Sequence, residues 1–254
     1  PSKNHDHPYD PVLTGHVTAA LDDLNAQLSA LARVRGIGFA DIYGRTKELL
    51  TSDRTCIGGW VVTKRSSGDG DSDAMFLDDG FHPNTPLQAI FAQIILDTFN
   101  NRYGTSLPRL ANREIVNKCL DENPDVTFTQ WTTNYGIAAA DRGALADPDR
   151  DGVPNIVEYG LDLDPIRVDS NLLPKPVIIT QSGQSYLTLT WQPRDPANTA
   201  HCEITPQQSS DLLTWTDVPA ASVTSASLNV RTVSVPFDAA HPVWLRLKVR
   251  QIGL

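Results

Sequence analysis

The chain has 254 residues and a formal net charge of -9 at pH 7, and 40% of its residues are hydrophobic. The negative charge and the lack of a basic stripe argue against a nucleic-acid partner. No apolar run approaches the roughly 18 residues of a membrane span, so no span is expected. The chain begins at Pro1 and not at Met, so we expect a processed chain or a fragment.

The first predicted elements form a helix–strand–helix pattern. Apolar side chains recur at spacings of three and four from Thr14 to Arg35, which predicts a helix, and Gly36 follows in the C-cap role. The run IGFADIY, residues 37–43, favours a short strand, and a short helix continues to Leu50. This order is typical of α/β folds. The apolar positions of the first helix are Val17, Leu21, Leu24, Leu28, Leu31 and Val34.

The stretch TCIGGWVV, residues 55–62, predicts one strand, and the polar residues 64–73 predict a loop. A strong helix follows. Thr85, Pro86 and Gln88 fit an N-cap, a proline at the first helical position and a capping-box partner. The expected buried face of this helix, which Gly104 ends, consists of Ile90, Phe91, Ile94, Ile95 and Phe99.

An aspartate and a histidine precede this helix in the segment FLDDGFHPN, residues 76–84. A histidine that acts as a general base for a serine needs an acid to fix its tautomer. Asp79 stands three residues before His82, and Gly80 gives the backbone freedom to turn between them. The pattern is short and arises by chance in many proteins. A surface or helix-capping histidine is the alternative interpretation.

The segment FLDDGFHPNTPLQAIFAQIILDTFN, residues 76–100, resembles the last conserved block of the SGNH (GDSL-type) hydrolases. The preceding LDDLNAQLSALARVRGIGFADIY also resembles that family. The resemblance implies a partial three-layer α/β/α domain and a serine esterase, with His82 as general base and Asp79 as its partner. The family's nucleophile lies far upstream of this block. The GDS of residues 70–72 has no strand before it and no helix after it, so we reject it as the nucleophile.

The segment DPDRDGVPNIVE, residues 147–158, satisfies the calcium-loop pattern D-x-D-x-D-G-x5-E. Ca²⁺ takes six to eight oxygen ligands, and Gly152 permits the sharp bend that lets alternate residues converge. A solvated acidic turn is the alternative. With NIVEYGLDLDP, residues 155–165, the loop resembles dockerin-like or thrombospondin type 3-like calcium elements, which are connectors in secreted bacterial proteins. Asp162 and Asp164 are further candidates, and the predicted ligands are Asp147, Asp149, Asp151, the Val153 carbonyl, Asn155 and Glu158.

From about residue 172 onward, polar and apolar residues alternate. YLTLTW, residues 186–191, and WLRLKVR, residues 244–250, each place alternate apolar side chains on one face. Clusters of Pro, Asn, Asp and Ser separate these runs, which favours an antiparallel β-sandwich similar to fibronectin-III or immunoglobulin modules. We expect Trp191 in the core. Trp215 and Trp244 are candidates for a carbohydrate-binding face.

These patterns predict three parts. Residues 1–107 complete an SGNH-like α/β domain, residues 108–166 form a helical connector with a structural Ca²⁺ loop, and residues 167–254 form an all-β sandwich. The resulting hypothesis is the C-terminal fragment of a secreted esterase that acts on an ester substrate, such as an acylated carbohydrate or lipid. The alternative is a non-enzymatic, calcium-stabilised adhesion or carbohydrate-binding protein. Two of the residues Cys56, Cys119 and Cys202 can form one disulfide, or all three can be free thiols.

Overall fold

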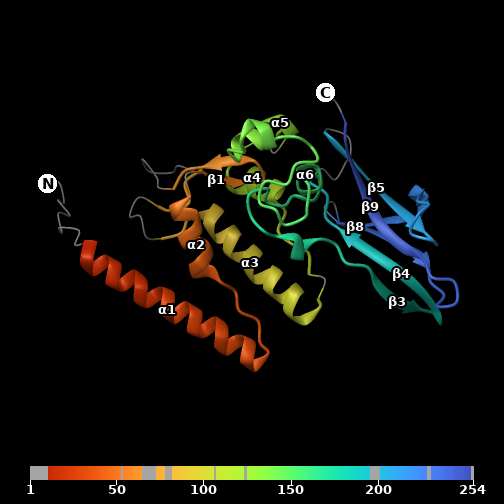
Figure 1. The fold of residues 1–254 in the computed structure, drawn as a ribbon, viewed down its shortest axis with the longest axis horizontal. Coiled ribbons are helices and arrows are strands. Elements are labelled where there is room, and N and C mark those ends of the chain that lie inside the picture. Colours follow the sequence, from red (N-terminus) through yellow and green to blue (C-terminus); the bar gives the residue numbers. More distant parts are fainter. Residues whose placement is uncertain are drawn as a thin grey trace.

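The computed structural model describes residues 11–52, 54–64, 73–77, 82–105, 107–122, 125–194, 201–227 and 230–252. Over these residues the chain is a mixed α/β structure with six α-helices, three short 3₁₀-helices and three antiparallel sheets (Figure 1). The longest helices come from the N-terminal part, and the two larger sheets come from the C-terminal part (Figure 1). None of the described helices is long and apolar enough to cross a membrane.

The first predicted helix is confirmed. α1 runs over Pro11–Arg35, and Gly36 follows it with a φ of 66°. Its apolar stripe is exposed, from 42% at Leu21 to 83% at Val34. Polar contacts hold the helix instead, such as the ion pair of 2.6 Å between Lys47 Nζ and Asp22 Oδ1. The spacing therefore predicts the helix correctly but does not reveal what covers its apolar face.

The prediction of a strand over residues 37–43 is wrong. Residues 37–41 are irregular, and α2 (Ile42–Thr51) begins inside the expected strand. The side chain of Asp41 accepts a hydrogen bond of 2.8 Å from Gly44 N and so caps α2. A strand needs a hydrogen-bonding neighbour, which this segment lacks among the described residues, whereas an N-cap stabilises a helix locally.

The single strand expected over residues 55–62 is a β-hairpin. β1 (Thr55–Ile57) pairs antiparallel with β2 (Trp60–Val62). Gly58 and Gly59 join them with φ values of 55° and 88°. A tight two-residue hairpin turn requires two consecutive positive φ angles. The Gly-Gly pair in the sequence therefore indicates such a turn.

α3 (Thr85–Tyr103) confirms the strong helix, and Gly104 ends it with a φ of 63°. Its N-cap is Asn84 and not Thr85. The expected buried face is only partly correct. Ile90 is buried in the core beside α4 (Asn112–Cys119), and Phe91 and Ile94 are partly buried. Ile95 and Phe99 are 41% and 47% exposed.

The middle of the chain forms an aromatic core. Trp131 of α5 (Phe128–Asn134) is fully buried and contacts Tyr135 and Tyr159 edge to face. Tyr159 belongs to α6 (Asn155–Leu161), which follows the short 3₁₀-helix η1 (Ala139–Asp141). All three aromatic side chains are buried, and they pack α5 against α6.

All three cysteines are free thiols. Cys202 is buried, and Cys56 and Cys119 are partly buried. Burial, with the charge of Asp164, raises the pKa of the Cys56 thiol to about 12. A thiol with such a pKa is not a nucleophile at neutral pH.

Two antiparallel sheets make up the C-terminal part, and side chains from both share one core. One sheet has the order β3-β4-β8-β7 and the other β6-β5-β9. Leu189 and Val233 of the first sheet belong to the same buried cluster as Ile204 and Leu245 of the second. Trp191 is also buried there, as expected. The strands are β3 (Val177–Gln181), β4 (Gln184–Trp191), β5 (Cys202–Ser209), β6 (Thr216–Asp217), β7 (Val223–Ser227), β8 (Val230–Pro236) and β9 (Trp244–Gln251).

The alternation predicted for β9 is confirmed. Leu245, Leu247 and Val249 face the shared core, and the intervening Arg246, Lys248 and Arg250 are exposed. Trp215 and Trp244, the candidates for a carbohydrate-binding face, are both partly buried. The guanidinium of Arg246 lies 4.1 Å from the centre of the Trp215 ring and covers one of its faces.

A buried ion pair joins the N-terminal and C-terminal parts. Arg194, just after β4, contacts Asp162 Oδ1 through Nη1 at 3.1 Å, and both side chains are nearly inaccessible to solvent. The other Arg194 nitrogen, Nη2, donates to Gly58 O in the hairpin turn. Asp162 Oδ2 accepts a hydrogen bond of 2.8 Å from Asn112 N at the start of α4. One charge pair therefore holds the hairpin, α4, the end of α6 and the end of β4.

We expect Arg194→Ala to lower the free energy of unfolding by about 3–5 kcal/mol, because the substitution leaves the Asp162 carboxylate buried without a counter-charge. The matched control is Arg250→Ala, since Arg250 pairs with Glu203 on the surface. The control should cost less than about 1 kcal/mol. Urea denaturation measures both changes. If both variants lose the same free energy of unfolding, the buried Arg194–Asp162 pair does not stabilise the junction more than a surface ion pair does.

Candidate metal centre

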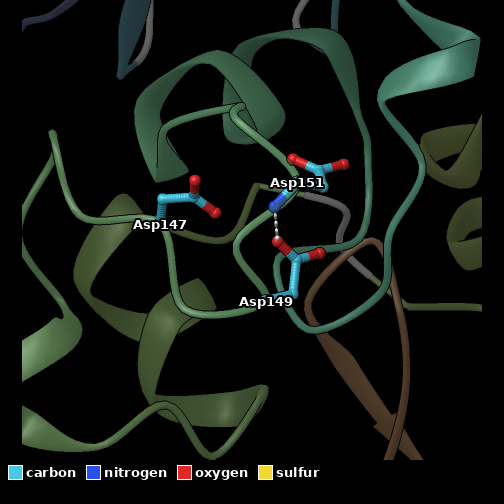
Figure 2. Close-up of side chains that lie close together, drawn as sticks. All are labelled: Asp147, Asp149 and Asp151. Atoms are coloured by element: carbon cyan, nitrogen blue, oxygen red, sulfur yellow. Dashed lines mark hydrogen bonds between the residues drawn. The ribbon is translucent and has the colours of Figure 1, made fainter.

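The predicted calcium loop folds as a tight turn before α6. Gly152 has a φ of 91°, a conformation that glycine adopts without strain. Its N–H donates to Asp147 Oδ2 at 3.0 Å. Asp151 N donates to Asp149 Oδ1 at 3.2 Å, the dashed line in Figure 2. These hydrogen bonds between aspartate side chains and the backbone hold Asp147, Asp149 and Asp151 in one tight turn.

The turn brings three of the predicted ligands together. One carboxylate oxygen from each of Asp147, Asp149 and Asp151 lies within 4.8 Å of the others, and all three residues are partly exposed (Figure 2). Like charges at this spacing repel one another in the absence of a counter-ion. Proximity alone is common for exposed acidic groups, so the buried residues around this turn decide what it can bind.

A second, buried group contains Asp151, Glu158 and Asp169, again with ligand oxygens within 4.8 Å of one another. Glu158 of α6 is 0% exposed and Asp169 is 4% exposed. Asp169 stands just before the 3₁₀-helix η2 (Ser170–Leu172), well beyond the predicted loop. Asp151 belongs to both groups and joins them.

Several buried oxygens at this place have no hydrogen-bond partner. Both carboxylate oxygens of Glu158 are in this state, although the side chain is fully buried. A buried carboxylate without partners is costly unless a cation or a proton compensates its charge. No ion pair with Arg or Lys reaches Glu158 or Asp169 among the described residues. The oxygens without a partner are Asp147 Oδ1, Asp149 Oδ2, Asn155 Oδ1, Glu158 Oε1 and Oε2, and Asp169 Oδ1.

Burial, and after it the neighbouring carboxylates, raises the pKa of three acids at this site. Burial, followed by the charges of Asp149 and Asp169, raises the pKa of Glu158 to about 9. Burial and then the charge of Asp164 raise the pKa of Asp169 to about 7. Burial is also the main reason that the pKa of Asp149 rises to about 6. In the absence of a cation, the site therefore takes up protons at neutral pH.

The remaining predicted ligands, Asn155 and Val153, lie in the same turn. Asn155 is fully buried, and its Nδ2 donates to Asp141 O at 2.8 Å and to Gly143 O at 2.9 Å, which fixes the amide group. Val153 N donates to Asp151 Oδ1 at 2.9 Å, and its side chain is buried in the core shared by the two larger sheets. The donor set is entirely oxygen, which suits a hard divalent cation.

Two further acidic candidates have other partners. Asp162 pairs with Arg194, as described above. Asp164 lies 3.5 Å from Arg45 Nη2, and its Oδ1 accepts a hydrogen bond from Ile166 N. Neither belongs to the two groups of converging oxygens. Asp169 joins the converging carboxylates instead. The calcium-loop pattern did not include it because that pattern ends at Glu158.

The predicted Asp79–His82 pair stays a prediction, because Asp79 lies outside the described residues, as do residues 70–72. His82 is exposed and lies just before α3. Its carbonyl oxygen accepts a hydrogen bond of 3.0 Å from Leu77 N, and Phe76 forms an antiparallel bridge with Pro83. The two ends of the segment that contains Asp79 are therefore held together.

With a chelator present, we expect the free energy of unfolding to fall as the pH rises from about 4.5, the ordinary pKa of Glu158, towards about 9, its pKa in the fold. The reason is that the folded state binds a proton that the unfolded state has already lost. Glu158→Gln removes this group, so it should flatten the pH dependence and raise the stability at pH 7 by roughly 1–3 kcal/mol. Urea denaturation in EDTA at several pH values measures the effect. If the free energy of unfolding of Glu158→Gln depends on pH as strongly as that of the wild type, this prediction is wrong.

No protein-family model matches the chain, and neither a curated protein nor a solved structure matches it. The chemistry of the site's own residues therefore has to indicate its function.

Proposed function

We propose that the chain is a calcium-braced structural part of an exported protein, in which one Ca²⁺ fixes the junction between the N-terminal helices and the C-terminal sheets. The observation that carries this proposal is the fully buried Glu158, whose two oxygens lack partners beside Asp151 and Asp169. A cation supplies the charge and the contacts that these oxygens lack.

The donor set favours calcium over other metals. Zinc and copper sites use histidine or cysteine, and each group of converging ligands among the described residues contains only aspartate and glutamate. Magnesium keeps several waters and rarely uses an all-protein cage, whereas calcium accepts six to eight oxygens in flexible geometry. Asp147, Asp149, Asp151, Asn155 and Glu158 offer enough oxygens for such a shell.

The position of α6 gives the cation a mechanical role. Val157 of α6 packs against both the aromatic core and the core of the two sheets. Gly160 lies so close to the second sheet that a Cβ built on it would come within 2.8 Å of Val249 Cγ1. A cation bound by Glu158 would fix the first turn of α6. Gly160, which has no side chain, allows the other end of α6 to pack closely against β9.

An exported protein is the natural setting for such a site. Extracellular calcium sites work at dissociation constants of roughly 10⁻⁴–10⁻³ M, because calcium is plentiful there. The aspartate-rich loop resembles connector elements of secreted proteins, and the two antiparallel sheets that share one core support the expected sandwich module.

The thermal midpoint tests the proposal. Calcium at about 100 times its dissociation constant should stabilise the fold by about 2.7 kcal/mol, which corresponds to a rise in Tm of roughly 5–10 °C for a chain of this size. Asp149→Asn should reduce this rise. Asp23→Asn, which removes an exposed carboxylate of α1, should leave it unchanged. A midpoint that is the same in CaCl₂ and in EDTA would falsify the proposal.

The second candidate function is the Asp–His part of a serine esterase. The observation that favours it is the closed segment before α3, where Leu77 N bonds to His82 O. This hydrogen bond places Leu77 beside His82, which is exposed. In the complete enzyme, His82 would take a proton from a serine supplied by an upstream segment, and Asp79 would orient the imidazole.

The exposed apolar faces of two helices also support this second candidate. Leu21, Leu24 and Leu28 of α1 are 42% to 51% exposed, and Phe99 and Tyr103 of α3 are 47% and 52% exposed. Helices of an α/β/α domain bury such faces against a central sheet. Among the described residues of this region, the only sheet is the short β1–β2 hairpin.

The 254-residue chain should not hydrolyse p-nitrophenyl acetate faster than its His82→Ala variant, because it lacks a nucleophile at the family position. A longer protein that includes the upstream gene sequence should show turnover that His82→Ala abolishes. Initial rates of p-nitrophenol release measure both. If the longer protein shows no His82-dependent turnover, the esterase hypothesis is wrong and the calcium-braced structural role stands alone.

A further inference from the structure

We propose that Asp169 is a ligand of the same cation and that, through it, the cation holds η2 against α3. This inference rests on the proposed calcium site and adds to it a residue from outside the twelve-residue loop. It gives the site a specific task, which is to attach the segment that leads into β3.

The Asp169 side chain is positioned as a ligand. It is 4% exposed, and one of its oxygens lies within 4.8 Å of one oxygen each of Asp151 and Glu158. Oδ2 accepts a hydrogen bond of 3.0 Å from Asp164 N, which fixes the carboxylate plane. Oδ1 is buried without a hydrogen-bond partner. One oxygen is therefore anchored and the other is available to a cation.

The backbone around Asp169 is already tied to the calcium loop. Asp151 Oδ2 accepts hydrogen bonds from Asp169 N at 2.9 Å and from Ser170 N at 2.7 Å. Asp151 therefore contacts both stretches of chain, the loop and the start of η2. A cation between Asp151, Glu158 and Asp169 would remove the repulsion that opposes this arrangement.

The 3₁₀-helix η2 is the element between α3 and the first sheet. Asn171 and Leu172 line a cavity of about 380 Å³ together with Asp97 of α3 and Trp191 of β4. The same two residues line a second cavity, of about 430 Å³, beside Ile94 of α3. These cavities leave part of the surface of η2 without packing partners. A cation bound to Asp169 would supply the missing constraint.

Isothermal titration with CaCl₂ tests the ligand role on the full chain. Asp169→Asn keeps an oxygen for Asp164 N but removes the charge, and it should weaken calcium binding by about tenfold or more. Asp23→Asn should bind as the wild type does. If the wild type binds calcium and Asp169→Asn binds it equally well, this inference is wrong and the calcium-braced function survives. If the wild type binds no calcium, both are wrong.

Hydrogen exchange on the wild-type protein tests the attachment of η2 without any variant. The amides of Ser170 and Leu172 donate to Asp151 Oδ2 and to Asp169 O, so their protection reports whether this segment is closed. Adding CaCl₂ should raise their protection at least about tenfold, since a bound ligand stabilises the closed state. Protection that rises at Asp151 and Val153 but not at Ser170 and Leu172 would overturn the inference.

Discussion

The burial of unpaired carboxylates at one junction is the constraint on which the structure depends. Glu158 is fully buried with both oxygens lacking partners, and Asp151 and Asp169 lie beside it. A fold does not retain such a group unless something compensates its charge. Glu158 belongs to the short helix α6, which packs against both the aromatic core and the core of the two larger sheets.

Two kinds of electrostatic contact therefore act at the junction. Arg194 and Asp162 form a complete pair within the chain, and it ties the hairpin turn and α4 to the end of β4. In the acidic centre, none of the described Arg or Lys side chains pairs with Glu158 or Asp169, so a proton or a cation has to compensate their charge. The charge of Asp162 is compensated within the chain, whereas the proposed calcium ion would compensate the charge of the acidic centre.

The sequence predicted the features that are set by local chemistry. Spacings of three and four predicted α1 and α3, alternation predicted the inward face of β9, and the aspartates around Gly152 predicted the turn that gathers Asp147, Asp149 and Asp151. It failed where the outcome depends on distant partners. Residues 37–41 resemble a strand but have no neighbour to pair with among the described residues, and the apolar stripe of α1 has no described core to enter. Asp169 was missed because only the folded chain brings it back to Glu158.

A crystal structure grown in CaCl₂ tests the central claim most directly. We predict one cation bound by oxygens of Asp149, Asp151 and Glu158 at about 2.3–2.6 Å, the usual calcium–oxygen distances. It would be identified by its anomalous signal. A structure without a cation at Glu158, in which the buried carboxylates turn to solvent or pair with basic side chains, would contradict the account.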